Sequence, residues 1–533
     1  MPLSNDLRMF ARFANGLRDY YREPIDPACC FSALQAQVKQ REDRFLQTLE
    51  RAVFQHPKSP YLRLLDWAGV ELGDLRKLVL ADGVDAALAK LRDAGIYVGI
   101  EEFKGRRPIK RSGLELVVEA ADFDSPVLRR PIEALTGGSG GVPRLILLDL
   151  DQITEDALSY GAFLEMFALA HRPSAIWRPV LPGAAATRKA LMLTRLGSPL
   201  ERWFSQQPSR LTSGAAKACL MTSFIVRGSR FFGGSIPKPE WTPLEEAERV
   251  ARWAHECVKR GTPPLIDTMV SGGVRVCLAG RELGLDLSGT FFRFGSEPYT
   301  APKAKVISDA GCDATQFYAI TECGHVGIGC GAPSAPDDVH VLLGKMAAIE
   351  AARPPEAADG LCFYLTTLIP HAPKIMINVE SGDHGVLDSR SCGCPLDRCG
   401  HSLHIRNLQS YEKLTAGGMH FLADDLTRLI EQVLPSRFGG GPTDYQFVED
   451  HRGELPQVKI IVSPRVGAVN NQAVVAAALG ALGAKSPADQ MMASQLKQGA
   501  VFQIERREPH VTVASKVPVL HVIRTGDGRR KPA

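Results

Sequence analysis

A glycine-rich stretch at residues 136–144, TGGSGGVPR, has the composition of an anion-binding loop. Glycines permit positive φ and let the backbone approach an anion closely, so successive N–H groups can point at phosphate oxygens. Thr136 and Ser139 add hydroxyl donors. The stretch lacks the Lys-Ser/Thr pair of a P-loop, and the strand-like run LILLDL follows it instead of preceding it. The composition therefore indicates a phosphate cradle, with a surface turn as the alternative.

Cysteines and histidines also gather in two short segments, GCGAPSAPDDVHV (329–341) and SCGCPLDRCGH (391–401). Thiolates and imidazoles at short spacing suit tetrahedral Zn²⁺. Buried unpaired cysteines are the alternative. The residues concerned are Cys330 and His340 in the first segment, and Cys392, Cys394, Cys399 and His401 in the second.

A third cysteine lies beside a histidine in TECGH (321–325). Cys323 and His325 are only two residues apart in a glycine-containing loop, which rarely allows the contact that a Cys–His nucleophile needs. We therefore do not expect a catalytic cysteine here.

Length and composition limit the class of protein. The chain has 533 residues, of which 45% are hydrophobic and 23% charged, so it can bury a sizeable core and should divide into two or more domains. The net charge of +4 is small for this length, and we expect no nucleic-acid partner. Twelve cysteines in a chain of this length do not indicate a disulfide scaffold.

Hydropathy predicts no membrane partner. The longest small-apolar run, at 473–484, is well short of the roughly 20 residues that span a bilayer. The N-terminal sequence has charges within its apolar pattern and no signal-peptide core, so we expect a cytoplasmic location.

Helical and strand-like segments alternate through most of the chain, which predicts an α/β fold in layers. We expect a helical cap (1–80), a large α/β domain (81–408), and a small α+β lid domain (409–533). Predicted strands are 96–103, 144–150, 289–295, 316–320, 361–368, 375–379, 445–450 and 458–463; predicted helices are 83–95, 156–170, 243–260 and 423–434.

Four motifs in order resemble those of the adenylate-forming superfamily of acyl-CoA synthetases. TGGSGGVPR is similar to its phosphate loop, FGSEPYTAPKAKVI (294–307) to its Gly-Ala/Gly-Glu-Pro segment, FYAITECG (317–324) to Tyr-Gly-x-Thr-Glu, and ESGDHGVL (380–387) to Thr-Gly-Asp. YEKLTAGGMHF (411–421) resembles the hinge and the first turn of the C-terminal domain. The Gly-x-Glu-Pro segment and the nearby cysteines resemble the phenylacetate-CoA ligase branch most.

The resemblance implies a role for each matching residue. Asp383 would accept hydrogen bonds from the ribose hydroxyls of ATP, a role that suits a carboxylate with two donors to satisfy. Thr321 would contact the α-phosphate, Glu322 would hold Mg²⁺, and Lys516 would be the catalytic lysine that the lid delivers. The β- and γ-phosphates would contact Thr136, Gly138, Ser139, Gly141 and Arg144; Glu297 and Pro298 would flank the adenine, and Tyr318 would stack on or near it.

The chain departs from the family pattern at two places. Gly137 and Gly140 stand where the phosphate loop of the family has hydroxyl residues. At the hinge, Gln409 stands where the family has an arginine that contacts ribose, and Arg406, three residues earlier, is the candidate substitute. This departure leaves open a non-catalytic relative that binds nucleotide without turnover.

Some members of the phenylacetate-CoA ligase branch also have a structural zinc. The matching residues here are Cys330, His340, Cys392 and Cys394, so the resemblance implies a structural Zn²⁺ as well as the Mg²⁺.

The implied reaction uses ATP to convert a small carboxylic acid, aromatic or another organic acid, into an acyl-adenylate and pyrophosphate. The acyl group then passes to a thiol such as coenzyme A. An amine or protein thiol is the alternative acceptor. The oligomeric state stays open, with a homodimer as one alternative.

Overall fold

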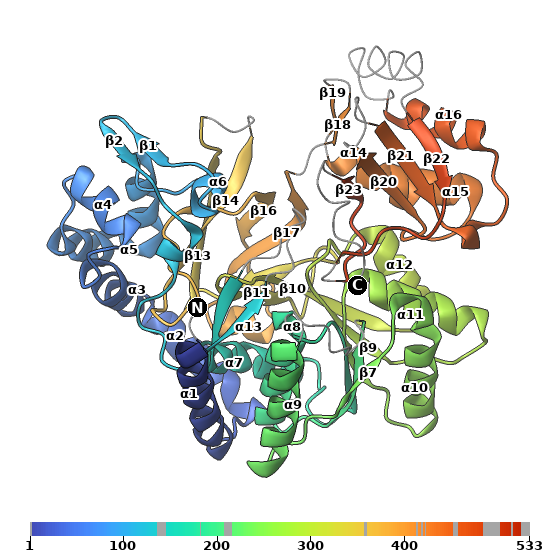
Figure 1. Ribbon diagram of the computed structural model, residues 1–533, viewed down its shortest axis with the longest axis horizontal. Coiled ribbons are helices and arrows are strands. Elements are labelled where there is room, and N and C mark those ends of the chain that lie inside the picture. Colours follow the sequence, from blue (N-terminus) through green and yellow to red (C-terminus); the bar gives the residue numbers. More distant parts are fainter. Residues whose placement is uncertain are drawn as a thin grey trace.

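Figure 1 shows the computed structural model of the chain, with helices from the N-terminal part on one side and a small C-terminal unit on the other. Among the described residues, no helix combines the length and apolar character that crossing a bilayer requires. The structure describes residues 3–135, 145–181, 183–206, 216–355, 360–411, 414–416, 419–421, 423–450, 457–482, 502–512 and 515–523.

A ten-stranded sheet runs through the large part of the chain, and its two halves differ in strand direction. Neighbouring strands are parallel from β7 to β10, where most of the connections run through helices, and antiparallel from β10 to β16. The change of direction falls at β10, which leads into the turn of Thr321 and Glu322, called the Thr-Glu turn below. In spatial order the strands are β16 (Asp383–Ser389), β17 (Leu403–Ser410), β12 (Val339–Val341), β11 (Gly324–Gly329), β10 (Asp313–Ile320), β9 (Phe291–Phe294), β8 (Leu265–Asp267), β5 (Ser174–Trp177), β6 (Leu200–Ser205) and β7 (Pro239–Trp241).

Helices cover both faces of the parallel half. Successive side chains of β5 point to opposite faces, so Ile176 packs with one group of helices while Ala175 and Trp177 pack with another. The α/β class predicted from the alternating pattern is confirmed. The first group includes α7 (Leu150–Met166), α8 (Ala184–Arg195) and α9 (Ala216–Phe231), and the second includes α10 (Ala247–Lys259), α11 (Val270–Glu282) and α12 (Ala301–Asp309).

Helices of the N-terminal part pack into the same cores as the large sheet. Phe13 and Leu17 share a buried cluster with Ile176, and Leu88 shares another with Val326. The predicted division at residues 80 and 81 falls inside α5, which bends at Gly83. The helices are α1 (Leu3–Arg22), α2 (Cys30–Lys39), α3 (Arg41–Leu49), α4 (Pro60–Trp67), α5 (Leu72–Asp93) and α6 (Ile100–Phe103).

Short sheets complete the large part. The predicted strands at 144–150, 289–295, 316–320 and 361–368 are confirmed as β4, β9, β10 and β14. The short sheets are β1 (Ile109–Arg111) with β2 (Leu114–Leu116), β3 (Pro131–Leu135) with β4 (Leu145–Asp149), and β13 (Met346–Ala352) with β14 (Leu361–Thr367) and β15 (Val379–Glu380).

Two predicted strands are wrong. Residues 96–103 make one isolated bridge, at Val98, and then form α6, because the Glu102 carboxylate accepts a hydrogen bond from the Gly99 N–H and caps the helix. Residues 375–379 are interrupted at Asn378, whose φ of 47° lies outside the strand region, so only β15 forms.

The C-terminal unit has a core of its own, formed by residues between Leu426 and Leu520. In Figure 1 this unit lies beside α11 and α12. Ion pairs join the two parts: Lys303 Nζ lies 2.7 Å from Glu431 Oε1, and Arg275 Nη2 lies 3.6 Å from Glu508 Oε2. The elements are β18 (Leu414–Ala416), β19 (Met419–Phe421), α14 (Ala423–Arg428), α15 (Leu434–Phe438), β20 (Tyr445–Asp450), β21 (Gln457–Val462), α16 (Asn471–Leu482), β22 (Phe502–Arg506) and β23 (Leu520–Ile523).

Candidate functional site

The predicted phosphate loop lies outside the described residues, and its flanks are an antiparallel strand pair. Leu135 at the end of β3 is the partner of Leu145 at the start of β4. The five predicted phosphate ligands of this loop, Thr136, Gly138, Ser139, Gly141 and Arg144, therefore stay predictions.

Tyr318 and Asp383 meet although 65 positions separate them in the chain. Tyr318 lies near the carboxyl end of β10 and Asp383 begins β16, and the tyrosine hydroxyl donates a hydrogen bond to Asp383 Oδ2 over 2.8 Å. Burial raises the pKa of Asp383 to about 6, while the Tyr318 hydrogen bond and the charge of Lys516 act in the opposite direction. Burial and the Asp383 charge raise the pKa of Tyr318. The pair is therefore a neutral donor beside a carboxylate that is ionised at neutral pH.

Thr321 and Glu322 form the turn that follows β10, and both are partly exposed. The Glu322 carbonyl accepts a hydrogen bond from the Lys374 N–H over 2.9 Å, which fixes the backbone of the turn. The partly exposed Glu322 side chain thus extends from a backbone held in place, at the turn where the predicted Mg²⁺ site would be.

Lys516 lies in a tight turn of the C-terminal unit. The Thr512 N–H donates to the Lys516 carbonyl over 2.9 Å, and Thr512 Oγ1 accepts from the Lys516 N–H over 3.0 Å. Ser515, directly before the lysine, has φ 58°, a region that few non-glycine residues adopt. Because the Lys516 charge lowers the pKa of Asp383, its ammonium group lies within electrostatic range of that carboxylate.

Glu297 and Pro298 have different surroundings. The Glu297 carboxylate is buried and accepts hydrogen bonds from Ser271 and Val517, whereas Pro298 is exposed and its carbonyl accepts from Lys303 Nζ over 3.2 Å. Glu297 therefore joins the large part to the residue that follows Lys516.

Arg406 is engaged on the antiparallel half of the sheet. Its guanidinium pairs with Asp388 on β16, and Gln409 lies opposite His384 in the β16–β17 pairing. The structure thus brings Tyr318 and Asp383 into contact, places the Lys516 charge near enough to lower the pKa of Asp383, and gives Arg406 a carboxylate partner of its own.

A buried charged network that the sequence did not reveal lies under the Thr-Glu turn. Asp156 on α7 accepts the His325 N–H over 3.1 Å and pairs with Lys345 and Arg188. Burial would raise the pKa of Asp156, but His325 and the cations Lys345 and Arg188 hold it far below its ordinary value. The sequence feature that could have indicated this network is Asp156, a charged residue at the start of the largely apolar helical segment 156–170.

The His325 ring belongs to the same network. Its Nδ1 lies 2.8 Å from Ser159 Oγ and its Nε2 lies 2.8 Å from Lys189 Nζ. Both ring nitrogens are engaged, which leaves none for Cys323 and agrees with the expectation that TECGH is not a Cys–His nucleophile.

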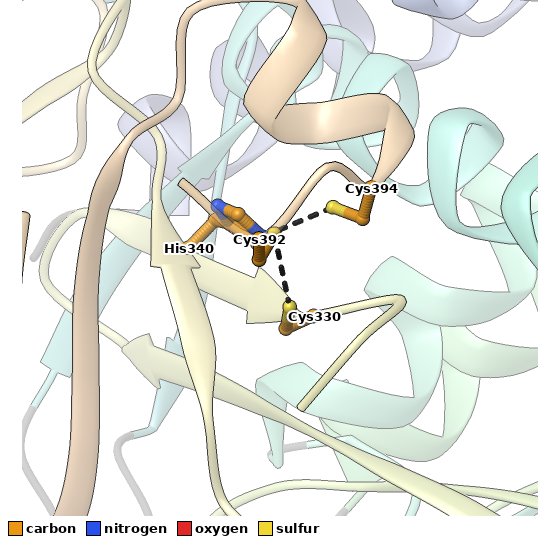
Figure 2. A group of neighbouring side chains, drawn as sticks. All are labelled: Cys330, His340, Cys392 and Cys394. Carbon is orange, nitrogen blue, oxygen red and sulfur yellow. Dashed lines mark hydrogen bonds between the residues drawn. The ribbon is translucent and has the colours of Figure 1, made fainter. Parts of the chain in front are cut away.

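Figure 2 shows Cys330, His340, Cys392 and Cys394 with their side chains directed toward one another. The four candidate ligand atoms all lie within 4.8 Å of one another. Cys330 Sγ is 3.6 Å from Cys392 Sγ, and His340 Nε2 is 3.2 Å from Cys394 Sγ. Hydrogen bonds from Cys330 and His340 lower the pKa of the Cys394 thiol to about 2.

Backbone pairing explains how these groups converge. β11 and β12 are antiparallel with Ile328 opposite His340, so Cys330, just after β11, comes beside the histidine. His340 Nδ1 bonds to the His401 carbonyl, which orients Nε2 toward the sulfurs. Cys399 is directed elsewhere, toward the Phe31 carbonyl.

Sequence comparison finds no matching protein family and no matching curated protein. Among solved structures, the chain is similar to a 2-hydroxyisobutyryl-CoA ligase in the postadenylation state in complex with R3-HIB-AMP, with 13% identity, 95% of this chain and 92% of that chain covered, and a TM-score of 0.52. The chain has the adenylate-forming fold. The same ligase in complex with 2-HIB-AMP gives a TM-score of 0.51 at the same identity and coverage. The fold implied by the four motifs is thereby confirmed.

Proposed function

We propose that this protein uses ATP to activate a carboxylic acid and then passes the acyl group to a thiol such as coenzyme A. The observation that carries the proposal is the hydrogen bond between Tyr318 and Asp383, which come from two strands of the large sheet. The Lys516 charge, from the C-terminal unit, lies near enough to lower the pKa of Asp383. The solved ligase of this fold is described with an acyl-adenylate, which supports the same chemistry for this chain.

In the first half-reaction a carboxylate oxygen of the acid attacks the α-phosphorus of ATP, and the bond to pyrophosphate breaks. Catalysis of such a transfer is mostly positioning and charge stabilisation. We assign Asp383 to the ribose hydroxyls, Tyr318 to the adenine side, Thr321 to the α-phosphate and Lys516 to the negative charge that develops on the transferring group. Mg²⁺, held by Glu322, would neutralise phosphate charge.

In the second half-reaction the thiol sulfur attacks the acyl carbonyl, and AMP leaves as the bond between the acyl carbon and the phosphate oxygen breaks. We propose that residues 409–533 act as a lid on the 81–408 domain and deliver Lys516, and that 1–80 form the cap. Of the two residues predicted to flank the adenine, we retain Pro298 and not Glu297, because the hydrogen bonds of Glu297 already go to Ser271 and Val517.

We further propose that Cys330, His340, Cys392 and Cys394 hold a structural Zn²⁺. Three thiols and one imidazole are ligands that zinc prefers. Four protein ligands complete a tetrahedral site and leave no open coordination position for catalysis. The zinc would hold the segment 392–394 against β11 and β12.

The Gly-x-Glu-Pro segment and the cysteine set favour a place in the phenylacetate-CoA ligase branch, and hence an aromatic or other organic acid. Transfer to an amine or a protein thiol is the alternative within the enzyme class. Gln409, at the position of the family arginine, favours a second candidate function, a nucleotide-binding relative without turnover.

The test is acid-dependent pyrophosphate release from ATP with a panel of aromatic and aliphatic acids. We expect release with at least one acid, and its loss in Lys516→Ala and Glu322→Ala. Lys305→Ala is the matched control, because Lys305 is an exposed lysine that pairs with Asp309 on α12. ATP binding without pyrophosphate release for any acid would instead establish the non-catalytic function.

A further inference from the structure

A buried carboxylate lies at the contact between the large part and the turn that carries Lys516. Glu297 is 8% exposed. Its Oε2 accepts the Ser271 N–H over 2.7 Å, and its Oε1 accepts both the Ser271 hydroxyl over 2.9 Å and the Val517 N–H over 2.7 Å. Glu297 therefore binds both partners through uncharged donors.

The Ser271 side of this contact is fixed. Ser271 is the second residue of α11, a helix of 13 residues. The first backbone N–H groups of a helix have no partner within the helix, and the helix dipole favours a negative charge there. The Glu297 carboxylate thus accepts the Ser271 N–H at the start of α11, which has no partner within the helix. Its other oxygen, Oε1, accepts the Val517 N–H of the C-terminal unit.

The Val517 side leads directly to Lys516. Three hydrogen bonds within the turn, among Thr512, Ser515 and Lys516, fix the lysine backbone relative to its neighbours. Val517 also packs against the buried cluster of α10 and α11. Since the turn is tight, holding the Val517 N–H in place also holds the Cα of Lys516.

We propose that Glu297 is a positioning residue: it holds the turn of Lys516 against the large part in the arrangement that forms the acyl-adenylate. This inference rests on the proposed function for its chemical role. A lid that turns away for the transfer to the thiol would break the bond to Val517, whereas both bonds to Ser271 lie within the large part and would stay. Glu297 therefore stabilises the adenylate-forming arrangement selectively.

Glu297→Gln is the informative change, because each carboxylate oxygen faces at least one backbone N–H. A glutamine places its NH₂ group against the N–H of either Ser271 or Val517, and two donors cannot bond. Ser271→Ala removes one hydroxyl and leaves both N–H contacts, so its effect should be smaller. Thr300→Val is the matched control: Thr300 bonds Glu431 across the same boundary without touching the Lys516 turn.

Two measurements test the proposal on the full chain. Amide hydrogen exchange of Val517 should be at least about 10-fold faster in Glu297→Gln, equivalent to about 1.4 kcal/mol, and unchanged in Thr300→Val. With an acid that supports pyrophosphate release, adenylate formation should fall at least about 10-fold in Glu297→Gln, while transfer from the chemically prepared acyl-adenylate to coenzyme A stays within about 2-fold of the wild type.

Unchanged exchange at Val517 in Glu297→Gln overturns the proposal. So does an equal fall in both half-reactions, because a merely structural defect acts on both. If the wild type releases pyrophosphate with no acid, the proposed function fails, and the exchange measurement still decides whether Glu297 holds the turn.

Discussion

The hydroxyl of Tyr318 and the carboxylate of Asp383 form a 2.8 Å hydrogen bond between β10 and β16, strands that three others separate in the sheet. Burial raises the pKa of Asp383 to about 6. A group that changes charge so near neutral pH gives the site a measurable pH dependence.

Nucleoside binding should weaken as the pH falls through about 6. An ionised Asp383 accepts hydrogen bonds from two ribose hydroxyls, and protonation removes part of that capacity. Adenosine is the suitable probe, because its own charge does not change between about pH 5 and about pH 8. Titration calorimetry should give a several-fold weaker affinity at about pH 5 than at about pH 8 in the wild type, with no such difference in Asp383→Asn. A pH-independent wild type would contradict the assignment of Asp383 to ribose.

The same carboxyl group should lower the stability of the protein at neutral pH. Its folded-state pKa is raised above the ordinary value of 3.8, so its stabilising contribution is present below that value and is lost as the pH rises through about 6. Asp383→Asn keeps an acceptor for Tyr318 and has no charge to bury. Thermal unfolding should show the variant more stable than the wild type at about pH 8, with the difference shrinking below about pH 5. A variant that is less stable at about pH 8 would show that the Asp383 charge is compensated in the folded state.

Local sequence patterns predicted many of the strands and helices correctly, but few of the contacts between residues far apart in the chain. The runs 316–320 and 361–368 lie in strands whose consecutive residues 315–318 and 362–367 are buried on both faces of the sheet. The run 375–379 failed because Asn378 adopts a positive φ and directs its side-chain amide to the carbonyls of Leu88 and Ile96. No sequence pattern around Asn378 could predict that its side chain would bond to carbonyls so far away in the chain.

In the candidate site too, the sequence identified residues by type but not their long-range contacts. Cys330 and His340 could be singled out by residue type, and the antiparallel pairing of β11 and β12 then brings them together. The bond from Val517 to Glu297 joins residues 220 positions apart. Sequence reasoning assigned Glu297 to the adenine side by resemblance, because nothing near Glu297 in the chain identifies Val517 as its donor.

The cysteine cluster should contain one zinc ion per chain. Metal analysis of the purified protein is expected to give about one equivalent of zinc, and Cys392→Ser or Cys394→Ser should lose it, because removing a thiolate leaves an incomplete tetrahedral set. A chelator should lower the thermal unfolding midpoint of the wild type, since zinc binding contributes to folding free energy.

Cys399→Ser is the control for this experiment. Cys399 lies five residues after Cys394 but directs its sulfur to the Phe31 carbonyl, so the variant should retain its zinc. Wild-type protein without stoichiometric zinc would contradict the proposed metal site and would mean that three reduced cysteines and one histidine simply pack together.

Neutralising the charge of Asp156 should lower the free energy of unfolding strongly. Asp156→Asn leaves Lys345 and Arg188 buried without their carboxylate, and breaking a buried pair in this way costs about 3–5 kcal/mol. Denaturant unfolding should show that loss. Asp309→Asn is the matched control: its partner Lys305 is exposed, and the change should stay within about 0.5 kcal/mol.

A second substitution separates charge from packing at Asp156. If unpaired charge is the cause, Asp156→Asn combined with Lys345→Met should recover part of the lost stability, because the added change removes a buried cation that has lost its partner. If the cause is a packing defect around α7, the two losses should add. The double-mutant cycle thus measures how far this network is an electrostatic support under the Thr321–Glu322 turn, since Asp156 also accepts the His325 N–H three residues after Glu322.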